Sequence, residues 1–376
     1  MRVRCRLYAL LALLWVAAAP RARALLTFNQ GKDRVFVNAT YTFGFDTNVF
    51  TQQVARSSVT QSASIGLSYA RKAGAISVNA SVGWSIGQFD QFKSQNFVDP
   101  SYSLSFTKGH GRTTGSLDLS AQRENNPDPD ANNRSISWDY SAALNLRYPV
   151  NERYFFTDGI TYTSAIYTNS ALFTNLGSEG NALDLNYVYD SKLNLSAGYS
   201  LGRSRTFDTT DYDHSLNFGA SGSLLPKLTG SIGFGYGYRD SLYSGHRDDY
   251  SSLTANGSLN YRFSHLVSFA GTVNKGFSTT STDISTDVTS ASINADLSLI
   301  HSLRTALGLD YTETAFLGAR GLGRADTLWQ FTANLGTAIT THLRTNLAYA
   351  YEVNYSNSSG AAFTRQDLSL NLQADY

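Results

Sequence analysis

Apolar and polar residues alternate one by one along much of this chain. In residues 342–355 every odd position from Leu343 to Tyr355 is apolar, aromatic or threonine, and every even position is polar, charged or alanine. Side chains of a β-strand alternate between two faces with a period of two. The segment therefore predicts one strand with an apolar face and a polar face, longer than the usual strand of about 5–6 residues.

The same unit recurs along the chain after very short polar turns. Comparable strands open at Leu193, Leu228, Leu266 and Leu303. A repeated hairpin of long alternating strands is typical of a transmembrane β-barrel. We therefore predict an all-β fold, a single antiparallel transmembrane barrel.

The connections between the predicted strands alternate between short and long. We count about 18 strands, from 34–46 to 364–376, and an even number returns the last strand to the periplasmic side. Short turns such as 71–74 are expected to face the periplasm, and longer polar connections such as 124–134 and 242–249 to face outward. No connection is long enough to predict a plug, and none clearly predicts a constriction.

Aromatic residues cluster toward both ends of the predicted strands. Those toward the loop ends are Trp84, Trp138, Tyr236, Tyr238, Tyr311, Trp329 and Tyr351, and those toward the turn ends are Tyr69, Phe106, Tyr148, Tyr261, Phe263 and Tyr376. Two aromatic belts at the two headgroup levels are expected of a membrane barrel. A soluble β-sandwich is the alternative, but its strands are shorter and its loops do not alternate so regularly.

The first 24 residues have the features of a secretory signal. Arginines precede a short apolar run, and Ala22 and Ala24 supply the small residues of a cleavage site. We predict a signal peptide at 1–24, a periplasmic lead-in at 25–33 and the barrel at 34–376. The single cysteine, Cys5, lies within the signal, so the mature chain has no disulfide.

Composition and charge narrow the function. The chain holds 23 Tyr, 21 Phe and 30 Gly, a mixture that favours strands and turns. The signal carries five arginines and no acid, so its removal changes the net charge from +1 to −4. A mildly acidic exported chain does not have the basic surface of a nucleic-acid-binding protein.

Charged residues inside the predicted strands fall on the polar face. An Arg or Lys side chain that faces lipid at the middle of the membrane destabilises the barrel by about 2–4 kcal/mol. The polar face is therefore expected to line a wide aqueous lumen. The candidate pore-lining residues near the turn ends are Arg147, Arg262, Arg304 and Arg344. Those nearer the loop ends are Asp46, Asp139, Asp184, Asp310, Glu352 and Asp367.

Both ends of the barrel segment resemble known outer-membrane sequences. Leu368, Leu370, Leu372, Ala374 and Tyr376 alternate up to a terminal aromatic residue, which resembles the C-terminal signal read by the outer-membrane assembly machinery. Residues 41–50, with Asp46, Asn48, Val49 and Phe50, resemble the first strand and loop of the putative β-barrel porin 2 family. The resemblance implies an outer-membrane barrel, and some related barrels are associated with exopolysaccharide export.

Catalytic and metal-binding patterns are weak in this sequence. The G-x-S-x-G match at 83–87 lies inside an alternating strand, whereas a hydrolase needs a sharp turn there. We predict no enzyme activity, no cofactor and no metal site.

The main hypothesis is a water-filled passive channel for small polar solutes in the outer membrane. The alternatives are a polysaccharide export conduit with periplasmic partners, and a non-conducting anchor or adhesin. The sequence predicts neither the oligomeric state nor the solute.

Overall fold

The structure is a computed structural model that describes residues 25–375, except 73, 129, 130, 132, 169–172, 301 and 302. The predicted signal peptide and Tyr376 lie outside the described residues. Two short helical turns are η1 (Lys93–Gln95) and α2 (Gly318–Gly321). Within the described residues, no helix has the length and apolar character needed to cross a membrane.

The strands are β1 (Leu26–Phe28), β2 (Asp33–Asp46), β3 (Ser58–Arg71), β4 (Ser77–Phe89), β5 (Phe97–Lys108), β6 (Thr114–Asp128), β7 (Asn133–Pro149), β8 (Tyr154–Tyr167), β9 (Leu176–Val188), β10 (Leu193–Arg205), β11 (Thr209–Leu225), β12 (Leu228–Tyr243), β13 (His246–Arg262), β14 (Val267–Thr279), β15 (Ser285–Ile300), β16 (Leu303–Phe316), β17 (Ala325–Ala338), β18 (Leu343–Ser356) and β19 (Phe363–Asp375).

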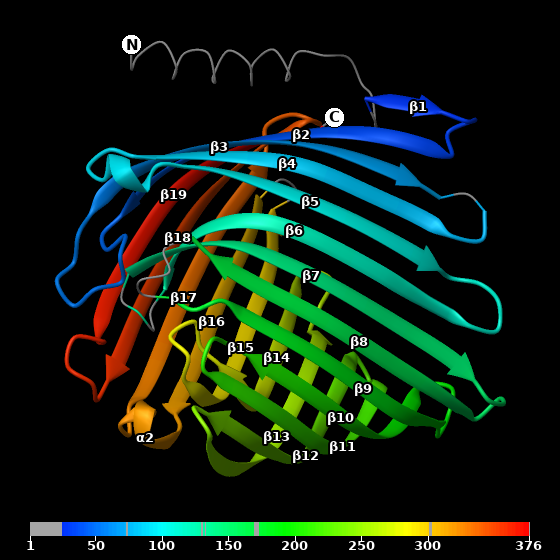
Figure 1. Ribbon diagram of the computed structural model, residues 1–376. Helices are drawn as coiled ribbons and strands as arrows, with labels where there is room; N and C mark the ends of the chain where they lie inside the picture. The colour runs from blue at the N-terminus through cyan, green and yellow to red at the C-terminus, as the bar shows by residue number, and fades with distance from the viewer. Residues whose placement is uncertain are drawn as a thin grey trace.

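The sheet closes on itself. Each strand from β2 to β19 pairs antiparallel with its neighbours in sequence, and β19 pairs with β2 from Asp367↔Asp46 to Asp375↔Asn38. The closed ring thus has 18 strands, as predicted, and β1 adds only a short pairing to β2 outside it. Figure 1 shows the strands running obliquely around the barrel, the first strands in blue beside the last in red. Because the first and last strands pair, the ring has no free edge strand, which a membrane-spanning sheet requires.

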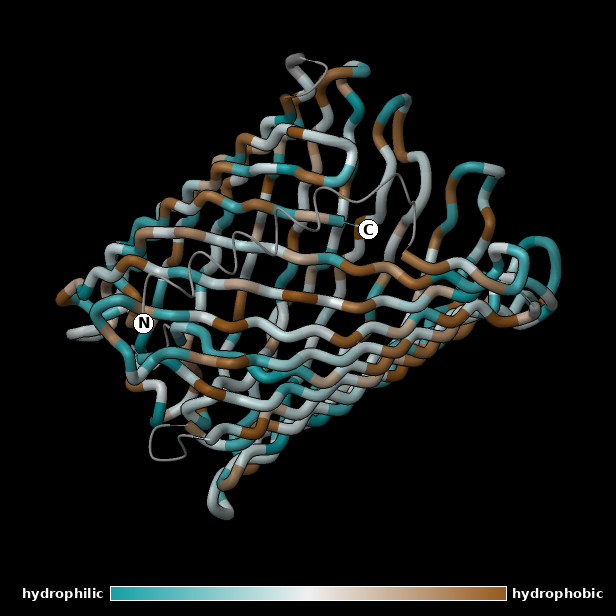
Figure 2. Tube along the Cα trace, turned by 90° about the horizontal axis from the view of Figure 1, so that it is seen from above, coloured by the Kyte–Doolittle hydropathy of each residue, from teal (hydrophilic) through white to brown (hydrophobic). Residues whose placement is uncertain are grey.

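The predicted alternation separates two faces of the wall. Large apolar side chains at alternate positions are exposed, such as Phe43 and Phe45 on β2, and Leu368 and Leu370 on β19. Along the trace in Figure 2, hydrophobic and hydrophilic positions follow one another along the strands. The exposed apolar face is the outer one, because lipid replaces the packed core of a soluble protein.

Several strands extend farther toward the loop end than predicted. The β12–β13 ladder continues to Tyr243↔His246, so most of the predicted loop 242–249 is strand. Similarly, β7 begins at Asn133 rather than at Ile136. Polar residues read as loop can continue a ladder above the membrane, where backbone pairing does not require an apolar face.

Two hairpins leave the wall at this end. β13 and β14 stop pairing at Ala255↔Lys275, although β14 remains paired with β15 as far as Thr279↔Ser285. In the same way, β5 and β6 stop pairing at Ser101↔Gln122, while the β6–β7 ladder continues to Asp128↔Asn133. The ends of the β6–β7 and β14–β15 hairpins are therefore free to turn into the barrel.

Candidate functional site

The register places all ten candidate pore-lining residues on the inner face. On β7, Asp139 and Arg147 alternate with the exposed outer residues Tyr140 and Leu146. The other eight likewise have the opposite parity to the exposed apolar residues of their own strands. Whether these side chains contact a passing solute stays a prediction.

Two of the candidate acids are held in an ion-pair cluster. Arg365 of β19 donates through Nη2 to Asp46 Oδ2 at 2.9 Å and lies 3.4 Å from Glu352. Asp46 also accepts the backbone N–H of Asn48 at 2.8 Å. Sequence reasoning missed Arg365, although it has the same parity as Asp367. The cluster joins β2, β18 and β19 across the closure of the ring.

The remaining charges of the candidate set are separated along the lumen. Within the described residues, no ion pair involves the four arginines or the acids Asp139, Asp184, Asp310 and Asp367. Arg147 instead lies over the Phe155 ring at 4.1 Å. Asp139 and Asp367 lie toward the loop ends and the arginines toward the turns. Asp184, which was predicted nearer the loop end, lies closer to the turn end of β9 and in the same row of the ladder as Arg147.

A buried arginine holds the β14–β15 hairpin against the inside of the wall. Arg239 of β12 is fully buried and binds Asp213 through two hydrogen bonds of 2.6 and 2.7 Å. Its Nη1 donates to the Ser278 carbonyl at 2.6 Å, and its guanidinium lies 5.1 Å from the centre of the Phe277 ring. The end of β14 therefore packs on the inner side of β12 and not beside β13.

A second contact fixes both sides of the hairpin turn. Asp211 lies 3.2 Å from Arg239 and accepts hydrogen bonds from Thr279 and Ser285 at 2.6 and 2.8 Å. Thr279 ends β14 and Ser285 begins β15, so one carboxylate anchors the turn from both ends.

The tip of this hairpin, residues 280–284, spans the lumen. Asp283 is hydrogen-bonded by Thr206 and lies 2.8 Å from Arg320. On the far side, Ser281 Oγ donates to Asp128 Oδ2 at 2.9 Å, and Asp128 is the last residue of β6. β6 and β14 are eight strands apart in the ring of 18. The contact therefore joins nearly opposite sides of the barrel.

The loop 47–57 and the β6–β7 hairpin complete the constriction. Arg134 at the start of β7 donates to the Val49 carbonyl at 3.1 Å and lies 4.9 Å from the centre of the Phe89 ring. Val49, Phe50 and Phe89 form a small buried apolar cluster. The expectation that no connection clearly folds inward is wrong. Strand ends that leave the wall form the constriction, and loop length alone does not reveal them.

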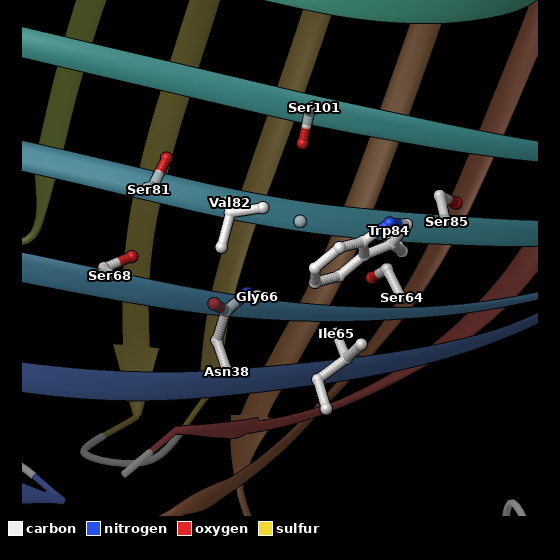
Figure 3. Close-up of a pocket in the computed structure, with 11 residues that line it drawn as sticks. Asn38, Ser64, Ile65, Gly66, Ser68, Ser81, Val82, Trp84, Ser85 and Ser101 are labelled. Atoms are coloured by element: carbon white, nitrogen blue, oxygen red, sulfur yellow. The ribbon is translucent and has the colours of Figure 1, made fainter.

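The inner wall away from the constriction is polar and has a shallow pocket between its strands. A pocket of about 340 Å³ on β2–β5 has inward-facing serines and Asn38 among its lining residues. Figure 3 shows Ser64, Ser81 and Ser101 around it on neighbouring strands. Within the described residues, no group of three His, Cys, Asp or Glu side chains is arranged to hold a metal ion.

The predicted assembly signal lies on the last strand. Leu368 and Leu370 are exposed on the outer face, and Ala374 is buried. Recognition of these residues by the assembly machinery stays a prediction.

Solved outer-membrane proteins share this fold. The outer membrane protein opdK from Pseudomonas aeruginosa aligns with a TM-score of 0.50 at 10% identity, over 91% of this chain and 99% of that chain. OccK2 (OpdF) from Pseudomonas aeruginosa, in complex with glucuronate, aligns with a TM-score of 0.50 at 11% identity, over 93% and 100%. At these identities the likeness shows the fold alone. No curated protein matches this sequence.

A family comparison agrees with the fold. The model of the family described as putative beta-barrel porin 2 matches residues 203–376. This stretch does not include residues 41–50, whose resemblance predicted the same family. The chain is thus an outer-membrane β-barrel with porin-like architecture, and over residues 203–376 it matches the putative beta-barrel porin 2 family.

Proposed function

We propose that this barrel is a passive, constricted channel that lets small polar solutes cross the outer membrane. The observation that carries the proposal is a polar inner wall narrowed at one level by two hairpins that meet at Asp128 and Ser281. A ring of this strand number encloses an aqueous lumen, because its side chains are too short to fill it. A local constriction then limits the size of the solute.

The charge distribution favours solutes with a positive group. The inner acids Asp139 and Asp367 lie in the loop-end halves of their strands, on the side of the constriction, whereas the arginines lie at the turns. Charges near the narrowest level act most strongly on a passing ion, because the low-dielectric walls focus their field. We therefore expect the channel to prefer cations over anions.

A polymer export conduit is less favoured. A polysaccharide chain needs a wide opening, whereas the tip 280–284, with its contacts on both sides of the lumen, leaves room for small solutes only. The porin-like fold also supports a channel over an enzyme.

Single-channel recording in planar bilayers tests the proposal. The refolded chain 25–376 should give discrete conductance steps, and neutral polymers of graded size should define a small exclusion limit. Replacing residues 280–284 with a two-glycine link should raise the conductance and the exclusion limit. Shortening the β18–β19 loop at 358–360, which takes no part in the contact, is the matched control. Absence of conductance above background would refute the channel.

A further inference from the structure

An acidic residue on the outer wall, Asp158, lies among apolar neighbours. Asp158 lies on β8 with the same parity as the exposed Phe156 and Ile160. Its cross-strand neighbours are Leu146 of β7 and Leu183 of β9, which are also exposed. Asp158 is thus surrounded on four sides by side chains that face lipid.

A polar partner lies beside it on the next strand. Asn181 of β9 donates through Nδ2 to Asp158 Oδ1 at 2.8 Å. Asn181 pairs across the strands with Ile160 on one side and the exposed Leu201 on the other. The hydrogen bond also shows that both side chains lie at nearly the same depth in the membrane.

This pair is incompletely satisfied against lipid. A carboxylate has two acceptor oxygens and an amide nitrogen has two N–H donors. The bond between them uses one of each, and no other hydrogen bond to either side chain is described. Hydrocarbon offers no replacement, so exposed polar groups of this kind face another polar surface in membrane proteins.

We propose that the β8–β9 wall is the contact surface for a second copy of this chain, related by a two-fold axis parallel to the membrane normal. Such an axis preserves depth and exchanges left for right. It places Asn181 of each copy opposite Asp158 of the other. The unused N–H of each amide then donates to the unused oxygen of the facing carboxylate, and both pairs are satisfied.

The self-complementarity of the pair is what selects a second copy as the partner. A two-fold contact uses the same patch on both subunits, so donor and acceptor must both be present in it. The surrounding residues Phe156, Ile160 and Leu183 supply apolar packing around the polar centre. Interhelical polar pairs stabilise association in membranes by the same physics.

Cysteine cross-linking tests the contact, since residues 25–376 contain no cysteine. Ile160→Cys should form a disulfide-linked dimer under mild oxidation in detergent and in vesicles. Leu347→Cys on β18, exposed on the far wall, is the matched control and should remain monomeric. Native mass spectrometry of the unmodified chain should show a dimer.

Removing the polar pair should remove the dimer but not the barrel. Asp158→Leu combined with Asn181→Leu should shift the mass to the monomer, while the change in gel mobility on heating and the single-channel conductance persist. Asp158→Asn should keep the dimer, because an amide can form the same reciprocal bonds. A monomeric wild-type chain, a trimer, equal cross-linking at Leu347, or a different protein bound at Ile160 would each overturn the proposal. Loss of conductance alone would count against the channel and not against the dimer.

Discussion

Replacing Arg239 with methionine should release the β14–β15 hairpin from the inner wall. The arginine is fully buried and joins Asp211, Asp213 and the Ser278 carbonyl in one cluster. Methionine keeps much of the side-chain volume and removes the charge and every donor. Two carboxylates then lose their shared cation, and Asp211 is left fully buried without it.

The size of the effect follows from burial. Removing one partner of a buried ion pair costs about 3–5 kcal/mol, because the other charge stays uncompensated. A change of 1.4 kcal/mol is tenfold in an equilibrium constant. The equilibrium constant for attachment of the hairpin to the wall should therefore fall by about two to three and a half powers of ten. The ring itself should remain closed, because the ladders of β11, β12 and β13 do not depend on the hairpin.

Single-channel recording separates these outcomes. The Arg239→Met channel should show higher mean conductance and frequent transitions between levels. Arg247→Met is the control, since it removes the same charge from an exposed pair with Asp240 that contributes little to stability. Adding Asp211→Asn to Arg239→Met should lower the mean conductance again and reduce the number of transitions between levels, because it removes the uncompensated carboxylate.

Wild-type conductance of the Arg239→Met channel, with an unchanged shift in gel mobility on heating, would refute this role of Arg239. The hairpin would then be held by its other contacts, and the buried cluster would not determine the constriction. An equal effect of Arg247→Met would show that net charge alone is responsible.

Three further predictions concern selectivity, closure and folding. Asp139→Asn with Asp184→Asn should move the reversal potential in a salt gradient toward zero, since two inner negative charges are lost; an unchanged potential would contradict the expected cation preference. Arg365→Met should lower the urea midpoint of unfolding by the equivalent of about 3 kcal/mol, because it leaves carboxylates unpaired at the closure of the ring; an unchanged midpoint would contradict this. Gly230→Ala should reduce the refolding yield, because a Cβ there would lie 1.9 Å from the Ser258 carbonyl oxygen. Gly276→Ala, with nothing within 4 Å, should refold normally.

The one-by-one alternation determined the fold class directly. It is a local property, because each residue's face depends only on its parity within the strand. The alternation in the sequence predicts that Leu347 and Leu370 lie on the apolar, lipid-facing side, and the structure exposes both. Short turns between long strands gave the order of pairing, and the even count gave closure between β2 and β19.

The constriction was decided only by the tertiary structure. Asp128 and Ser281 are far apart in sequence, and only closure of the ring brings the ends of β6 and β14 across one lumen. Arg239 is read from its parity as one more inner charge, and nothing local shows that it holds a hairpin. The alternation along a strand indicates whether a side chain faces lipid or water. The residue that this side chain contacts inside the ring depends on the path of all the strands between the two residues.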